Sequence, residues 1–184
     1  MTDLVSVMAA AEELGQDPGS LDVLVNNAGI ASGLEPASQV SLDDMRRTYE
    51  TNVFGVVAVT NALLPLLRRS PAARIVNVSS GLGSLSLMSD PAFEFADLNN
   101  AAYQSSKTAL NALTVLYAKD LRSAGIKVNA VCPGYRATDL NGGLPTPGAG
   151  DPADGAKIAV QLALIGADGP SGEFLSDSGT RYPW

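Results

Sequence analysis

Histidine is absent from this chain of 184 residues, and cysteine occurs only once. Without an imidazole, neither a serine–histidine–aspartate nor a cysteine–histidine arrangement can carry out catalysis. A single cysteine excludes an internal disulfide and a thiolate cluster, and we expect no metal site. Cys132 falls in an apolar run, which favours a small core residue.

Basic residues are also scarce, with 12 Lys and Arg against 19 Asp and Glu and a net charge of −7. An acidic chain is repelled by phosphate-rich surfaces, so we expect neither nucleic acid nor a membrane as partner. The most apolar stretch, "FGVVAVTNALLPLL", is interrupted by Thr60, Asn61 and Pro65, and is too short and too interrupted to span a bilayer. Nothing resembles a signal peptide, and we expect a cytoplasmic protein.

The remaining composition favours one globular domain over residues 1–184, because 46% of the residues are apolar and 17% are charged. Short apolar runs predict buried strands at 21–27, 73–80, 126–133 and 172–177, and helical patterns cover 3–14, 41–69, 101–125 and 151–166. Thr2, Ser41 and Asp151 are candidate helix caps, with Gly15 and Gly125 as stops. Long helices between strands predict an α/β fold with a parallel sheet and helices on both faces.

The stretch "YQSSK" sets a phenol, Tyr103, one helical turn before an ammonium, Lys107. Side chains at this spacing share a helix face. A free tyrosine has a pKa of about 10, and a nearby cation lowers it by favouring the phenolate. Such a phenol can give a proton to a carbonyl oxygen or accept one from an alcohol. The alternative is that two surface residues happen to have this spacing.

Four further signals accompany that pair. "VSSG" places Ser79 and Ser80 at the carboxyl end of a predicted strand, where open parallel sheets bind ligands. "NNAG" at 26–29 ends another strand, and its glycine lets backbone approach a ligand closely. Asn52 lies within a helix, where an amide is slightly unfavourable. "PGYRATD" at 133–139 follows a third strand and offers backbone groups and Thr138.

In this order, the motifs resemble the short-chain dehydrogenase/reductase family over nearly the whole chain. The resemblance implies that Tyr103 is the general acid/base and that Lys107 lowers the pKa of Tyr103 and binds the nicotinamide ribose. It implies that Ser80, rather than Ser79, polarises the substrate carbonyl, and that Asn52 holds a water of a proton relay.

The implied reaction is hydride transfer between NAD(P)H and the carbonyl carbon of a small molecule, or the reverse oxidation of an alcohol. Besides Tyr103 and Lys107, the implied cofactor contacts are Asn26, Asn27, Ala28 and Gly29 on the adenosine side and Pro133, Gly134, Arg136 and Thr138 near the nicotinamide.

The segment "LGSLSLMSDPAFEFADLNN" lengthens the stretch between Ser80 and Tyr103 beyond the common family pattern. Similar insertions occur in the carbonyl-reductase-like branch, whose members have a tail like "SGEFLSDSGTRYPW". Proteins of this branch are often monomeric and usually prefer NADPH. NADP is therefore the expected cofactor, with NAD as the alternative. The apolar residues of the insertion favour a packed cover or part of a substrate pocket, and a plain solvent loop is the other interpretation.

The family pattern also implies an initial strand and a glycine-rich turn, and neither precedes "LDVLVNN". "GLGSLS" at 81–86 lacks the third glycine. We therefore expect an N-terminally truncated, incomplete doubly wound (Rossmann-type) sheet of about four strands. The strand at 21–26 should then have an exposed edge that favours self-association. A catalytically inactive remnant or interaction module of the same family is the alternative function.

Overall fold

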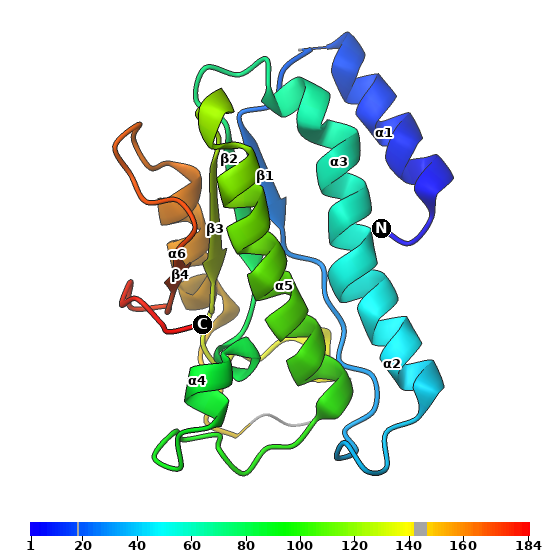
Figure 1. Cartoon of the computed structure of the whole chain (residues 1–184), viewed down its shortest axis with the longest axis vertical. Helices are drawn as coiled ribbons and strands as arrows, with labels where there is room; N and C mark the ends of the chain where they lie inside the picture. The colour runs from blue at the N-terminus through cyan, green and yellow to red at the C-terminus, as the bar shows by residue number, and fades with distance from the viewer. Residues whose placement is uncertain (18, 142–146) are drawn as a thin grey trace.

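The computed structural model describes residues 1–17, 19–141 and 147–184 and has a four-stranded sheet at its centre (Figure 1). The strands lie in the order β1 (Val23–Asn26), β2 (Arg74–Val78), β3 (Lys127–Val131) and β4 (Phe174–Leu175). Every neighbouring pair is parallel. The predicted α/β class with a parallel sheet is confirmed.

Helices connect the strands and cover both faces of the sheet. They are α1 (Leu4–Gln16), α2 (Leu42–Tyr49), the π-helical segment η1 (Glu50–Phe54), α3 (Gly55–Leu67), α4 (Leu85–Met88), α5 (Ala101–Asp120) and α6 (Pro152–Ala163), with short 3₁₀ turns η2 (Gly81–Gly83), η3 (Arg122–Ala124) and η4 (Asp139–Asn141). Figure 1 shows α3 and α5 on one face and α6 on the other, with α1 beside α3.

The alternation of side chains along the strands divides the core into two layers. Leu24, Ile75 and Val128 pack with α3 and the end of α5, whereas Val76 and Val131 pack with Ile158 and Leu162 of α6. Strands β2 and β3 are buried on both faces, and the buried asparagine in each, Asn77 and Asn129, is hydrogen-bonded. The carboxyl ends of the strands meet α4 and the beginning of α5 at one end of the molecule.

Local chemistry explains where the predicted element limits held and where they were wrong. Ser41 and Asp151 cap their helices as predicted. The cap of α1 is Asp3, not Thr2, because the Asp3 carboxylate accepts from the amides of Val5 and Ser6. Gly15 does not stop α1, which continues to Gln16.

Helix α5 and strand β4 are shorter than their predicted ranges. Helix α5 ends at Asp120, and a 3₁₀ turn leads to Gly125 in the left-handed conformation, with φ of 72°. The strand predicted at 172–177 pairs only over β4, because a turn follows in which the Ser176 amide donates to the Thr180 carbonyl. Part of the predicted loop after β3, residues 142–146, lies outside the described residues.

Among the described residues, one helix, the continuous stretch Leu42–Leu67, is long and apolar enough to cross a membrane by length and composition. It is longer than the apolar run recognised in the sequence, because α2, η1 and α3 join without a break. Of its most apolar window, 44% is buried within the protein, and α3 supplies Leu63, Leu66 and Leu67 to the core. These contacts are typical of a core helix in a globular domain.

The core contacts predict how strongly two leucines on helices differ in their contribution to stability. Leu67 is 0% exposed and Leu116 is 57% exposed. We expect Leu67→Ala to lower the free energy of unfolding by about 2–5 kcal/mol, since a cavity adds to the lost burial. Leu116→Ala should cost less than about 1 kcal/mol. Urea unfolding of both variants tests this, and equal losses would contradict the described packing.

Candidate active site

Tyr103 and Lys107 lie on the first two turns of α5, on the same buried side. Asn100 fixes the start of the helix, because its side-chain oxygen accepts from the Tyr103 amide at 3.1 Å. The Lys107 ammonium lies 5.7 Å from the centre of the Tyr103 ring. Both side chains are buried. The spacing in the sequence therefore does bring the phenol and the ammonium together, and they are not a surface pair.

The pKa values of this pair differ from the expected tuning. Burial raises the pKa of Tyr103 to about 12, while a hydrogen bond with the Ser80 side chain acts to lower it and nearby Cys132 raises it further. Burial lowers the pKa of Lys107 to about 8, with Cys132 acting in the opposite direction. In the protein alone, burial thus keeps the pKa of Tyr103 above its usual value, and a lowering of that pKa by Lys107 stays a prediction.

Ser80 lies at the end of β2, next to the phenol. Its hydroxyl accepts from the Leu82 amide at 3.2 Å and is a hydrogen-bond partner of Tyr103. The hydroxyl of Ser79 points elsewhere and donates to Asn111 Oδ1 at 2.6 Å in the buried core. Of the two serines, Ser80 is thus the one beside Tyr103.

Asn52 occupies the π-helical segment η1, a geometry that often marks functional sites. Its amide oxygen accepts from the Ile30 amide at 2.9 Å, and its nitrogen donates to the Ile30 carbonyl and to Ser106 Oγ, each at 2.9 Å. A Cβ on Gly29 would lie 3.3 Å from Lys107 Nζ and 3.4 Å from Asn52 Oδ1. The structure therefore brings Gly29, Asn52 and Lys107 to one place.

The other residues of "NNAG" differ from one another in burial and in their contacts. Asn26 is buried, and its nitrogen donates to Asn77 Oδ1 at 2.8 Å and to Thr60 Oγ1 at 3.2 Å. Its side chain thus joins β1 to β2 and α3. Asn27 and Ala28 are exposed beyond the strand.

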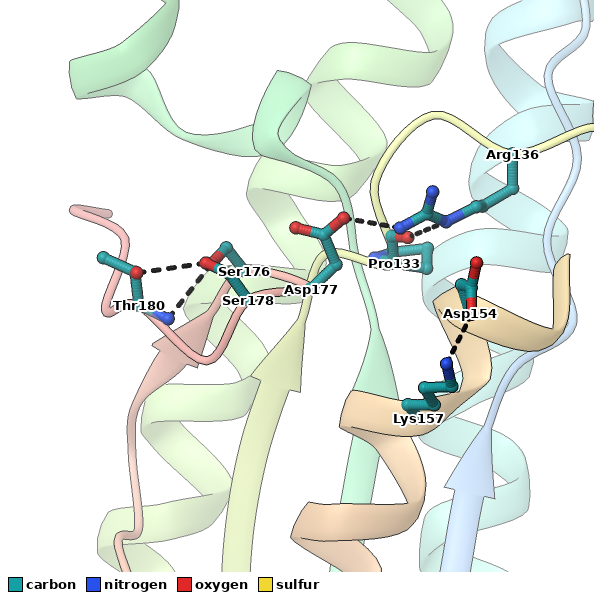
Figure 2. A network of polar contacts seen from close by, with 8 residues as sticks. All are labelled: Pro133, Arg136, Asp154, Lys157, Ser176, Asp177, Ser178 and Thr180. Atoms are coloured by element: carbon teal, nitrogen blue, oxygen red, sulfur yellow. Dashed lines mark hydrogen bonds and ion pairs between the residues drawn. The ribbon is translucent and has the colours of Figure 1, made fainter. Parts of the chain in front are cut away.

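The segment after β3 carries the remaining predicted contacts. Pro133 ends the strand region, Gly134 adopts a φ of 76°, and Thr138 is exposed. Figure 2 shows that the Arg136 guanidinium turns back, donating to the Pro133 carbonyl at 2.7 Å and to Asp177 at 2.5 Å. The Arg136 side chain is therefore engaged within the protein.

Sequence reasoning missed an aromatic cluster that borders the Ser80 turn. A Cβ on Gly81 would lie 3.5 Å from both Phe93 and Tyr182 and 3.8 Å from the Cys132 sulfur. Phe95 packs edge-on against Phe93 at 5.7 Å and against Tyr135 at 6.2 Å between ring centres. The insertion is thus packed beside the site. The insertion is rich in apolar residues, but no sequence signal indicates which of the aromatic side chains contact one another.

The stretch "GLGSLS" forms η2 and the start of α4 and serves close packing. A Cβ on Gly83 would lie 2.7 Å from the Lys107 carbonyl carbon. Gly83 therefore lets the turn after Ser80 pack directly on α5, so the role of this glycine is in packing. Its backbone oxygen also accepts from Asn111 at 3.0 Å.

Comparison with known proteins agrees with this geometry. The family model for short chain dehydrogenases matches residues 1–147. The short-chain dehydrogenase anuI of Penicillium roqueforti is 36% identical over 97% of this chain and 72% of its own length. The C-signal of Myxococcus xanthus is 35% identical over 90% of this chain and 94% of its own length.

A crystal structure of NADPH-bound carbonyl reductase from chicken fatty liver superposes on the whole chain and on 74% of that protein, with a TM-score of 0.86 and 29% identity. Together with the family match, it shows that the chain belongs to the short-chain dehydrogenase family and is carbonyl-reductase-like within it.

Proposed function

We propose that this protein reduces the carbonyl group of a small molecule with NADPH, or oxidises the corresponding alcohol. The observation that carries this proposal is the meeting of the Tyr103 phenol, the Ser80 hydroxyl and the Lys107 ammonium at the carboxyl end of a parallel sheet. The NADPH-bound carbonyl reductase that superposes on the chain supports the choice of NADP over NAD.

The residues fit the nicotinamide half of such a cofactor. The ammonium of Lys107 has three donors, and among the described residues its one hydrogen bond goes to the Val78 carbonyl at 2.8 Å. Its other donors are free for ribose hydroxyls. Gly29, without a Cβ, leaves room beside Nζ. Asn27, Ala28, Pro133, Gly134 and Thr138 provide further backbone and polar groups for the cofactor.

In the proposed reaction, bound NADPH supplies a hydride to the carbonyl carbon. Ser80 donates a hydrogen bond to the carbonyl oxygen and orients it toward Tyr103. The Tyr103 hydroxyl then transfers its proton to that oxygen, so that the product is a neutral alcohol. Because the pKa of Tyr103 is about 12, the phenol is protonated at neutral pH and ready to donate. The positive charge of Lys107 stabilises the phenolate that forms. Asn52 takes part in the relay that returns a proton to Tyr103.

A second candidate is an interaction or signal module built on the same fold. The C-signal match supports it, because that relative is covered over 94% of its own length and so has nearly the same extent. The outer edge of β1 provides a surface for this function. Since the Arg74 amide donates to the Asp22 carbonyl, the parallel ladder turns the amides of Val23 and Val25 away from β2. A second copy of the chain is the partner that this edge fits, through antiparallel β1 pairing.

The test of the catalytic proposal is the change Tyr103→Phe, which removes only the proton donor. We expect turnover of aldehydes and ketones to fall by at least about 100-fold while the affinity for NADPH changes little. NADPH oxidation and calorimetric titration with NADPH and NADH measure the two effects. Tyr117→Phe is the matched control, since that hydroxyl donates to Asn61 of α3 at an exposed position. Full turnover in the Tyr103 variant, or no NADPH binding by the wild type, would refute the proposal.

The lowered pKa of Lys107 predicts a pH dependence of stability. Between about pH 8 and the ordinary value of 10.5, the folded chain has released this proton while the unfolded chain retains it. Stability should therefore rise with pH over this range, by about 3 kcal/mol for this group. Urea unfolding of the wild type and of Lys107→Met between pH 7 and pH 10 measures the difference. Parallel pH curves for the two proteins would contradict the burial of a charged Lys107.

Pairing through β1 predicts that a charge on this strand prevents self-association. Val25 and Val160 are both exposed valines, on β1 and on α6. We expect Val25→Lys to weaken dimerisation by about tenfold or more, because like charges would face each other across the pair. Val160→Lys should have no effect. Sedimentation equilibrium over a range of concentrations tests this, and a wild type that remains monomeric throughout would exclude the edge as an interface.

A further inference from the structure

Arg136 joins its own loop after β3 to the tail after β4, in which Asp177 lies 41 residues further along the chain. Its Nε donates to the Pro133 carbonyl at 2.7 Å, and Nη2 bonds to the carboxylate of Asp177 at 2.5 Å (Figure 2). The Arg136 side chain is 18% exposed and that of Asp177 is 37% exposed. Charge-assisted bonds of this kind are shorter and stronger than neutral ones. The loop after β3 is thereby tied to the tail after β4.

Glycines surround the guanidinium and leave it the space that it occupies. A Cβ on Gly134 would lie 3.0 Å from Nη2, and one on Gly155 would lie 3.0 Å from Arg136 Cγ. A Cβ on Gly150 would collide with Nη1. The backbone is paired at the same place, since the Ala137 amide donates to the Gly150 carbonyl and the Gly150 amide to the Tyr135 carbonyl, both at 3.0 Å. The arginine is therefore held between the loop and the start of α6.

The far end of the tail is bound to the turn that follows Ser80. Ser84 Oγ donates to the Pro183 carbonyl at 2.7 Å, and Ser86 donates to the Trp184 carbonyl from its hydroxyl at 2.8 Å and its amide at 3.2 Å. Stacking of Phe174 on Trp184 secures the same end. One end of the tail thus depends on Arg136, and the other borders the proposed substrate side of the site.

We propose that Arg136 is a positioning residue that couples the cofactor side of the site to the substrate side. Through Pro133 it sets the course of the loop 133–138, and through Asp177 it holds the tail 176–184. This role replaces a direct contact between the Arg136 side chain and the cofactor, and it rests on the proposed reductase function.

The ion pair between Lys157 and Asp154 provides a matched control (Figure 2). It lies on the first turns of α6, close to Arg136, but its side chains are 70% and 54% exposed. It joins residues three positions apart on one helix and ties no loop to the tail. Exposed pairs of this kind contribute little. Removing it tests whether the loss of any nearby charge pair has the same effect.

The experiment compares Arg136→Met, Asp177→Asn and Lys157→Met with the wild type. For Arg136→Met we expect the amides of Ala137 and Gly150 to exchange with deuterium about tenfold faster or more. The KM for NADPH should rise by about tenfold, with kcat within about threefold, because binding geometry is lost while the proton donor remains. Lys157→Met should match the wild type in every measurement.

Asp177→Asn keeps the bond from Arg136 to Pro133 and removes the charge that holds the tail. It should speed exchange at the amides of Ser176 and Thr180 and raise the KM of the carbonyl substrate more than the KM for NADPH. This nearly isosteric variant decides the question if Arg136→Met fails to fold.

Two results would overturn the inference, and they differ from each other. Unchanged exchange and unchanged KM values in both variants, with a wild type that binds NADPH, would refute the role of Arg136 alone. A wild type that neither binds NADPH nor turns over carbonyl compounds would refute the proposed function, and the coupling role with it.

Discussion

The buried ammonium of Lys107 is the constraint on which the rest of the site depends. A cation inside the protein is costly unless it is hydrogen-bonded, and its acceptor here is the carbonyl of Val78 at the end of β2. To bring Nζ within 2.8 Å of that carbonyl, α5 must lie directly on the turn that follows β2. Gly83 makes this approach possible, since a side chain at that position would meet the Lys107 backbone. The same contact brings Ser80 to Tyr103.

How much of this arrangement the sequence could predict depends on whether the signal was local. The caps Ser41 and Asp151, the parallel direction of the strands and the shared helix face of Tyr103 and Lys107 follow from short-range rules, and these agree with the structure. The preference for Ser80 over Ser79 came from resemblance alone. The structure gives a physical reason for it, because Asn111 engages the other hydroxyl.

The failures concern properties that arise only when distant segments meet. The rise in the Tyr103 pKa comes from burial by neighbours, which a spacing of four residues cannot reveal. The resemblance implies a cofactor contact for Asn26, which stays a prediction, and its side-chain amide donates to Asn77 and Thr60, more than 30 residues away. Arg136 is engaged by Asp177, which is 41 residues further along the chain. In each case the partner lies far away in the sequence, where no local pattern identifies it.

The two candidate functions use different parts of the sheet. Tyr103, Ser80 and Lys107 belong to the carboxyl end of β2 and to α5, whereas the edge of β1 that faces away from β2 pairs with no strand among the described residues. Pairing at β1 need not move α5, because β2 lies between them and is hydrogen-bonded on both sides. Asn52 and Gly29 are the link between the two regions, since Gly29 is the third residue after β1 and lies beside Lys107. A change in the course of the chain after Asn26 on dimerisation would therefore act on the proposed proton relay before it acted on Tyr103.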